Sequence, residues 1–182
     1  FEVRTEDLKR GQRMSYSRSL IVDADHPARV LAITEGQGVT IGAPPEGLQK
    51  MTVERLDVVA SPDLPPLWQV FGGRQVDART WTLPELSAEV ASPDAALHVG
   101  PQFVMTETAA RSSVAEFAGT NAIVGASSHT MFLARAKSGP FTFVAEPIAG
   151  SGGTIASRTC VYDEGADRKL VTVATHMYRR AQ

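Results

Sequence analysis

The chain has 182 residues, 43% of them hydrophobic, which suits one domain or two small ones with a real core. Its net charge of −2 argues against a general affinity for nucleic acid or anionic membranes, and no apolar run approaches the roughly 20 residues of a membrane span. One cysteine, Cys160, excludes an internal disulfide and a cysteine-rich metal site, so a reducing, cytoplasmic setting is the simplest expectation.

Residues 1–43 predict antiparallel strands, and they resemble the strands predicted near the C-terminus. Laid on each other with an offset of 140 residues, the two segments align their apolar positions and an acidic turn. The identical pairs are Phe1/Phe141, Glu6/Glu146, Ser17/Ser157, Arg18/Arg158 and Asp23/Asp163. This pattern favours an internal repeat, and two unrelated hairpins of similar composition are the alternative.

Residues 44–72 carry five prolines and predict a connector with short helical pieces. The segment 73–83, "GRQVDARTWTL", predicts the first strand of a second copy that covers 73–182. If the repeat is real, the first copy has its final strands but no preceding helix. We therefore expect either a missing N-terminal half or a swapped or oligomeric arrangement.

A helix of about five turns is predicted between Pro101, at a position where helices tolerate proline, and Gly119, where helices stop. An apolar stripe at helical spacing runs from Phe103 through Val114 to Phe117, and Glu107 falls on it. A buried carboxylate has to be paired, protonated or placed in a cleft. The alternative is a rotated stripe that leaves Glu107 in solvent.

The remaining third predicts strands. The segments 121–136, 139–150 and 154–180 are rich in β-formers, and the last contains two long strands joined by the polar turn "DEGADRK". The predicted fold class is therefore α+β, with one long helix followed by three or four antiparallel strands.

The start of the helix, near residues 98–102, gathers free backbone N–H groups at the positive end of the helix dipole. Such a start suits an oxyanion or a polarised carbonyl, and Glu107 lies about two turns further on. The two features together favour acyl transfer, with the carboxylate attacking a carbonyl or activating water. No pattern of closely spaced ligands predicts a metal, and no cofactor is expected.

The segment "HVGPQFVMTETAA" resembles the active-site helix of hotdog-fold acyl-CoA thioesterases of the phenylacetate-degradation and hydroxybenzoyl-CoA type. That family has a His-Gly-Gly turn and an acidic residue nine positions after the histidine, as Glu107 follows His98. The resemblance covers about 73–182 and implies a long helix wrapped by a curved antiparallel sheet. With the trace in 1–43 it implies a tandem double hotdog with an incomplete N-terminal copy.

The resemblance also implies roles for individual residues. Glu107 would be general base or nucleophile, the N–H groups of Val99 and Gly100 would polarise the thioester carbonyl, and His98 would shape the turn. Residues expected to contact substrate are Phe103, Thr108, Ser113 and Phe132. The substrate would be an acyl-CoA or acyl-carrier thioester, and hotdog sites usually lie between two hotdog units, so a homo-oligomer is expected.

Two departures keep a second interpretation open. Val99 stands where the family has its first glycine, and the polar amide often found before the histidine is absent, with Ser92 and Asp94 in that region. The alternative is a non-catalytic hotdog protein that binds acyl groups or a protein partner. A hydratase of the same fold would need an Asp and a His about five residues apart, and no such pair is present.

Overall fold

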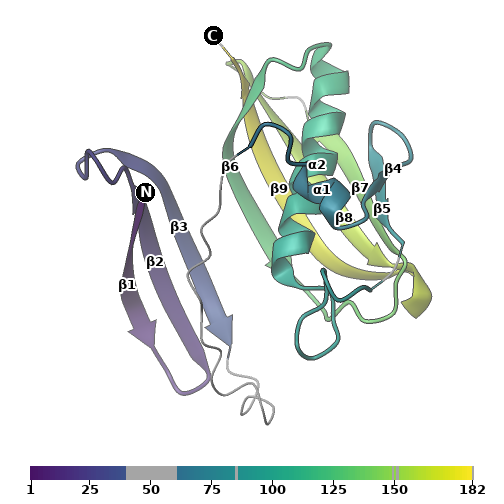
Figure 1. Ribbon diagram of the computed structural model, residues 1–182, viewed down its shortest axis with the longest axis horizontal. Helices are drawn as coiled ribbons and strands as arrows, with labels where there is room; N and C mark the ends of the chain where they lie inside the picture. Colours follow the sequence, from purple (N-terminus) through teal and green to yellow (C-terminus); the bar gives the residue numbers. More distant parts are fainter. Residues whose placement is uncertain (40–60, 85, 149, 151, 182) are drawn as a thin grey trace. The chain divides into compact units, whose positions relative to one another are not determined.

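The computed structural model describes residues 1–39, 61–84, 86–148, 150 and 152–181. The chain divides into two compact units, Phe1–Val58 and Val59–Gln182, which are drawn in Figure 1. No helix in the described ranges is long and apolar enough to cross a membrane. Much of the predicted connector, 44–60, lies outside the described residues.

The first unit contributes a three-stranded antiparallel sheet in the order β1-β2-β3. Its strands are β1 (Glu2–Arg10), β2 (Met14–Val22) and β3 (Val30–Val39). Within the described part of this unit only Val22 is buried. The sheet therefore has no core of its own.

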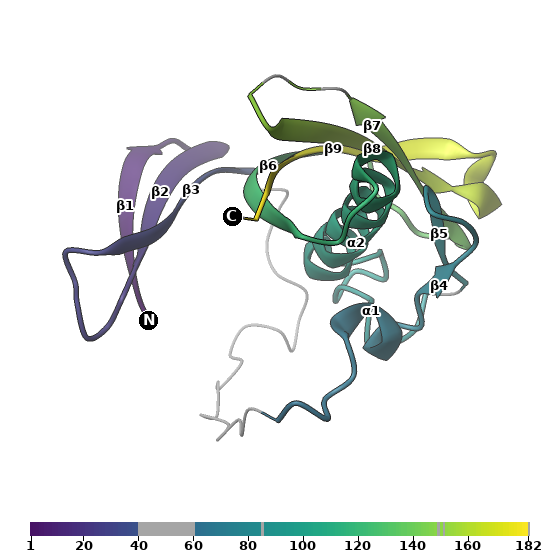
Figure 2. The same cartoon turned by 90° about the horizontal axis from the view of Figure 1, so that it is seen from above.

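The second unit is one long helix against a six-stranded antiparallel sheet, whose strand order is β4-β5-β7-β8-β9-β6. Figure 2 shows this sheet curving around the helix α2. The elements are α1 (Leu67–Val70), β4 (Arg74–Gln75), β5 (Thr80–Leu83), α2 (Val99–Ala118), β6 (Ile123–Phe132), β7 (Phe141–Ile148), β8 (Thr154–Asp163), η1 (Glu164–Ala166) and β9 (Lys169–Arg180). The predicted α+β class, the single long helix and the strands that follow it are confirmed.

The core of the second unit lies between α2 and the sheet. Alternate residues of β7 point inward, as the sequence predicts, so that Phe141, Phe143 and Ala145 are fully buried. The facing side of the helix presents Met105 and Ala109, also fully buried. Small residues on the helix allow the helix and the sheet to approach closely. The large aromatic side chains of β7 fill the remaining space between them.

The buried side of α2 is rotated relative to the predicted stripe. Phe103 and Phe117 are 41% and 50% exposed, whereas Met105, Thr106 and Ala109 are fully buried. Ala110 and Val114 of the predicted stripe are fully buried, so apolar spacing located the buried side only in part, and small and polar residues take the other positions against the sheet. Glu107 consequently lies at the border of the buried side and is half-buried.

The segment 73–83 forms a hairpin rather than the single strand that was predicted. β4 and β5 pair through Arg74 opposite Thr82, and Val76 lies in the turn, 64% exposed. The Asp77 carboxylate accepts the N–H groups of Arg79 and Thr80, at 2.8 and 2.7 Å, which stabilises the turn.

The two sheets share a pairing register at a constant offset. Val3 pairs with Ile21 in the first sheet, and Phe143 pairs with Val161 in the second, 140 residues later in each strand. The same shift relates every residue pair of β2–β3 to a pair of β8–β9, from Met14↔Val39 to Val22↔Val30. The irregularity after Ile21 recurs after Val161, so even the bulge is repeated.

Candidate active site

The N-terminus of α2 is capped by His98. Its imidazole Nδ1 accepts the backbone N–H of Gly100 at 3.2 Å, and its own backbone is extended, with φ −67° and ψ 151°. The N–H of Val99 has no acceptor among the described residues. His98, Val99 and Gly100 are all exposed. One free donor, on Val99, is therefore available at the positive end of the helix.

Glu107 is held by a tyrosine from the last strand. The Tyr178 hydroxyl lies 3.2 Å from both the carboxylate Oε1 and the backbone oxygen of Glu107 and donates toward them. Tyr178 is only 1% exposed. Burial, and then the Glu107 charge, raise the pKa of Tyr178 well above its usual range, so the phenol remains a hydrogen-bond donor.

His176 lies two residues before Tyr178 in β9, so both side chains point to the same side of the strand. Its ring packs edge-on against Phe103 of α2, with 5.9 Å between ring centroids. The side chain is buried, its Nε2 has no partner in the described structure, and burial lowers the pKa of His176 to about 4. The imidazole is therefore neutral at physiological pH.

Strand β6 is the edge strand of the sheet, next to β9, and it continues the face on which His176 and Tyr178 lie. Thr130 lies opposite Ala174, which is buried, and Phe132 lies opposite Thr172, whose hydroxyl contacts Gln102 of the helix at 2.5 Å. Residues directly opposite share a face, so both β6 residues face the side that carries α2. The Thr130 hydroxyl is the second buried polar atom of this region without a partner in the described structure.

Phe103 and Glu107 therefore lie next to His176 and Tyr178, and Phe132 lies further along the same face of the sheet, opposite Thr172. The other two predicted contact residues lie elsewhere. The Thr108 hydroxyl bonds the Val104 carbonyl oxygen at 2.8 Å. Ser113 is fully buried against β8, where its hydroxyl lies 3.1 Å from that of Ser157.

The carboxylate and the free N–H of one helix are too far apart to act on one carbonyl. Glu107 follows Val99 by eight residues, which corresponds to about 12 Å along a helix at about 1.5 Å per residue. A base and an oxyanion donor that act together must each lie roughly 3 Å from the reacting group or its water. One helix therefore supplies two half-sites.

The loop before the helix carries charged side chains where the related family often has a side-chain amide. Asp94 accepts a hydrogen bond from Ser92 and forms an ion pair with Arg135. The Ser92 hydroxyl, with a smaller contribution from Arg135, holds the pKa of Asp94 below its usual value. The Ser92 and Asp94 side chains are therefore bonded to each other and to Arg135, and they are not side-chain amides that could bind a substrate carbonyl.

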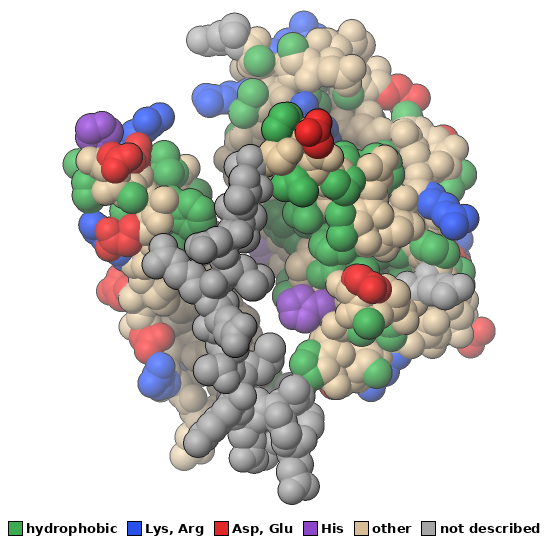
Figure 3. Space-filling view, viewed as in Figure 1, with side chains coloured by type: hydrophobic (Ala, Val, Ile, Leu, Met, Phe, Trp, Pro, Cys, Tyr) green, Lys and Arg blue, Asp and Glu red, His purple; other side chains and the backbone are tan. Residues whose placement is uncertain are grey.

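Sequence reasoning missed Tyr178, His176 and Thr130 as parts of this region. The available signal was the alternation along β9, where Thr172, Ala174, His176 and Tyr178 occupy every second position. Among the described residues, no group of three or more His, Cys, Asp or Glu side chains is placed to hold a metal ion. Figure 3 shows hydrophobic side chains gathered on the face of the second unit that carries α1 and α2.

Comparison with known structures identifies the fold of the second unit. No protein-family model matches the chain, and no curated protein matches it. AziG of S. sahachiroi has a TM-score of 0.56 and 22% identity, covering 65% of this chain and 98% of its own. A thioesterase of Staphylococcus aureus has a TM-score of 0.54 and 21% identity, covering 64% and 98%.

The phenylacetic acid degradation protein PaaI of Thermus thermophilus has a TM-score of 0.56 and 18% identity, covering 64% of this chain and 99% of its own. Of these structural neighbours, the Staphylococcus aureus protein is the one named as a thioesterase. At such identities the likeness shows the fold, and the second unit therefore has the hotdog arrangement of one long helix and a curved antiparallel sheet.

Proposed function

We propose that the second unit hydrolyses acyl thioesters, with acyl-CoA as the preferred form, and that Glu107 is its catalytic carboxylate. The observation that carries the proposal is the half-buried Glu107, held by the buried Tyr178 and bordered by the exposed ring of Phe103. Structural neighbours named as thioesterases support the reaction class.

The chemistry follows from the charge of the carboxylate. Glu107 takes a proton from a water molecule while the water oxygen bonds to the thioester carbonyl carbon, which forms a tetrahedral oxyanion. Collapse of that oxyanion breaks the C–S bond, and the departing thiolate receives the proton. In the alternative mechanism the Glu107 carboxylate attacks the thioester carbonyl carbon directly. The C–S bond breaks and the thiolate leaves, and water then hydrolyses the resulting anhydride, which restores the carboxylate.

The oxyanion is stabilised by the N–H of Val99. Since that N–H lies about 12 Å along the axis from its own Glu107, the pair must come from two helices. We therefore propose a site at which the Glu107 of one hotdog unit faces the Val99 N–H of another, supplied by a second copy of this chain. Gly100 contributes by fixing the turn, since its N–H already binds His98.

A non-catalytic acyl-binding or partner-binding hotdog protein is the second candidate function. Two observations favour it. Gly100 has its N–H occupied by the His98 ring, and the loop before the helix offers Ser92 and Asp94 in place of an amide. Such a protein would bind acyl-CoA at the same side of α2 without releasing thiol.

The decisive experiment compares free-thiol release from short, long and aromatic acyl-CoAs by the wild type, Glu107→Gln and Glu116→Gln. Glu116 is the matched control because it lies on the same helix, exposed, in an ion pair with Arg79. We expect Glu107→Gln to lose at least about a hundredfold in kcat, as removal of a general base does, and Glu116→Gln to stay near wild type. Equal release by all three proteins would exclude Glu107 as the base, and acyl-CoA binding without thiol release by the wild type would favour the second candidate.

We also propose that residues 1–43 and 73–182 are copies of one hotdog unit in tandem, the first of them incomplete within this chain. The shared 140-residue offset in strand pairing, including the repeated bulge, supports this interpretation. Similar composition alone would not reproduce the register of two consecutive strand pairs, because register is set independently in each hairpin.

A further inference from the structure

Two buried polar atoms near Glu107 have no hydrogen-bond partner in the described part of the chain. They are Nε2 of His176 on β9 and the hydroxyl oxygen of Thr130 on β6. His176 is 2% exposed, and burial keeps its imidazole neutral by lowering its pKa to about 4. A buried polar atom without a partner destabilises a fold, so each one that a protein retains needs an explanation, such as a bound molecule or water.

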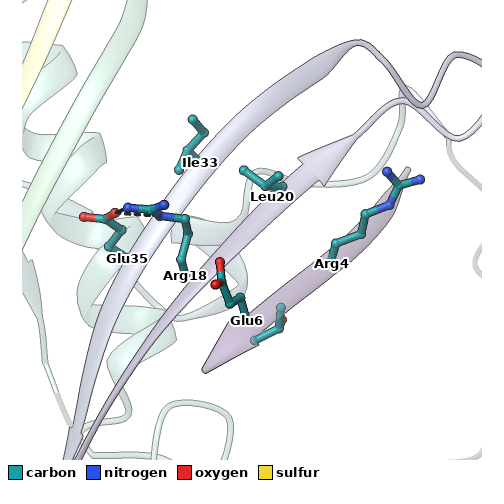
Figure 4. Close-up of a pocket in the computed structure, with 7 residues that line it drawn as sticks. Arg4, Glu6, Arg18, Leu20, Ile33 and Glu35 are labelled. Atoms are coloured by element: carbon teal, nitrogen blue, oxygen red, sulfur yellow. Dashed lines mark hydrogen bonds and ion pairs between the residues drawn. The ribbon is translucent and has the colours of Figure 1, made fainter. Parts of the chain in front are cut away.

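The hollow on the first sheet differs in this respect. Figure 4 shows the side chains around this hollow, whose volume is about 510 Å³, and they include Arg4, Glu6, Arg18, Leu20, Ile33 and Glu35. Arg18 and Glu35 form an ion pair at 2.7 Å, and Arg4 pairs with Glu2 at 2.9 Å. These exposed charges already have partners, whereas the polar atoms of His176 and Thr130 do not.

His176 and Thr130 lie on the same face of the second sheet. Ser128 is directly opposite His176 in the pairing of β6 with β9, and Thr130 is two residues further along β6. Thr130 is therefore the diagonal neighbour of His176, and such neighbours have Cβ atoms roughly 7–8 Å apart. One small polar group between the two side chains can contact both of them.

The surroundings of these two residues combine aromatic rings with an open side. The His176 ring packs edge-on against Phe103, with 5.9 Å between ring centroids, and Phe103 is 41% exposed. On β6, Ser128 is exposed and Phe132 is 47% exposed. A hydrocarbon chain that enters from the β6 side can contact the two phenylalanine rings on its way to the imidazole.

The sequence spacing along β9 sets the distance from these polar atoms to the proposed catalytic carboxylate. Tyr178, whose hydroxyl lies 3.2 Å from the Glu107 carboxylate, follows His176 by two residues. A strand rises about 3.3 Å per residue, so the imidazole lies roughly 6–7 Å along β9 from the residue that holds the carboxylate. That length corresponds to about five bonds of an extended chain.

We propose that His176 and Thr130 are specificity-determining residues that bind a hydroxyl group of the acyl chain, about five bonds from the thioester carbonyl. A hydroxyl is the matching group because it both donates and accepts hydrogen bonds, as a threonine hydroxyl and the two nitrogens of a neutral imidazole do. A plain hydrocarbon chain leaves both atoms without partners, so the site discriminates against it. The inference rests on the proposed acyl site beside Glu107, but it concerns binding and does not require hydrolysis.

The test measures the binding of two matched ligands to the whole 182-residue chain carrying Glu107→Gln, which removes the proposed base so that neither ligand is consumed. The ligands are 6-hydroxyhexanoyl-CoA and heptanoyl-CoA, which differ only in a terminal hydroxyl or methyl group. We expect calorimetry to show that the hydroxyacyl ligand binds about tenfold more tightly, because it supplies the missing hydrogen bonds.

Two further substitutions remove the polar atoms and keep the approximate size of the side chains. His176→Phe and Thr130→Val should each weaken binding of the hydroxyacyl ligand roughly tenfold and leave heptanoyl-CoA binding unchanged or tighter. A misfolded variant would lose both ligands, so it is distinguished from a change of preference. His129→Phe and Thr175→Val are the matched controls, because these residues lie opposite each other on the other face of the same two strands.

Equal binding of the two ligands by the chain with His176 and Thr130 intact would overturn the proposal, and would mean that water satisfies the two polar atoms. An equal loss of preference in the His129 and Thr175 controls would overturn it as well. Thiol release is measured separately, on the chain with Glu107 intact. A hydroxyl preference without thiol release would support this binding site and contradict the proposed hydrolysis, whereas thiol release without the preference would do the reverse.

Discussion

Glu107 depends on Tyr178 for its orientation. One phenol oxygen lies 3.2 Å from both the side chain and the backbone oxygen of Glu107, and Tyr178 itself is 1% exposed. In the proposed mechanism Tyr178 is a positioning residue, because its hydroxyl holds the carboxylate without touching a reacting atom.

Replacing Tyr178 with Phe should therefore lower kcat more than it raises KM. We expect a loss of roughly tenfold in kcat and about 1 kcal/mol in the free energy of unfolding, the usual net worth of one hydrogen bond. Steady-state thiol release and urea unfolding measure the two effects. A variant that loses stability but retains the wild-type kcat would show that the contact is structural only.

His176 couples the stability of the second unit to pH. Burial lowers its pKa from 6.5 to about 4, so the unfolded state binds a proton in a range where the folded state does not. The associated stability is fully present above about pH 6.5 and is lost as the pH falls toward 4, by on the order of 3 kcal/mol.

The variant His176→Leu removes this titration and leaves an apolar side chain against Phe103. Its free energy of unfolding should change less between pH 7 and pH 4 than that of the wild type, as urea titrations at each pH would show. Parallel pH profiles for the two proteins would contradict a buried neutral imidazole. Changes at acidic side chains affect both proteins alike and cancel in the comparison.

At the scale of elements, the loop between β6 and β7 is anchored by one carboxylate. Asp163, at the end of β8, is 1% exposed and accepts the backbone N–H groups of Lys137, Ser138 and Gly139 at 2.8 to 3.0 Å. We expect Asp163→Ala to leave these donors unsatisfied and to cost about 2–4 kcal/mol in the free energy of unfolding. Chemical unfolding measures the loss, and a cost below about 1 kcal/mol would mean that water replaces the carboxylate.

The sequence predicted where the helices and strands of the second unit lie along the chain better than it predicted which side of each is buried. Hydrophobic alternation located β7, and proline and glycine located the helix, because these signals are local. The buried side of α2 mixes apolar residues such as Met105 and Val114 with small and polar residues such as Thr106, so an apolar stripe marked it only in part. The nine-residue spacing of His98 and Glu107 found the helix half of the candidate site, whereas Tyr178 comes from a strand 71 residues away, which no local pattern connects to Glu107.

At the scale of the whole molecule, the proposed site needs more than one helix. The roughly 12 Å between the Val99 N–H and Glu107 along one helix separates the proposed oxyanion donor from the proposed base, and a second copy would bring the two together. The matching register of the two sheets suggests how such a pairing arose, as a hotdog unit that occurs more than once. These proposals predict that activity belongs to an assembly and not to an isolated second unit.

The most direct measurement mixes two inactive variants. Glu107→Gln lacks the base but keeps the N–H, and Val99→Pro lacks the N–H but keeps the base. Proline is well tolerated at the first helical position, and the extended backbone of His98 suits a residue before proline, so the second variant should fold.

After subunit exchange, half of the dimers are mixed and each has one intact site, so thiol release should return to about a quarter of the wild-type rate. Each variant alone should remain inactive. A mixture that stays as inactive as its components, although size measurements show that mixed dimers have formed, would contradict a site built from Glu107 of one unit and the Val99 N–H of another.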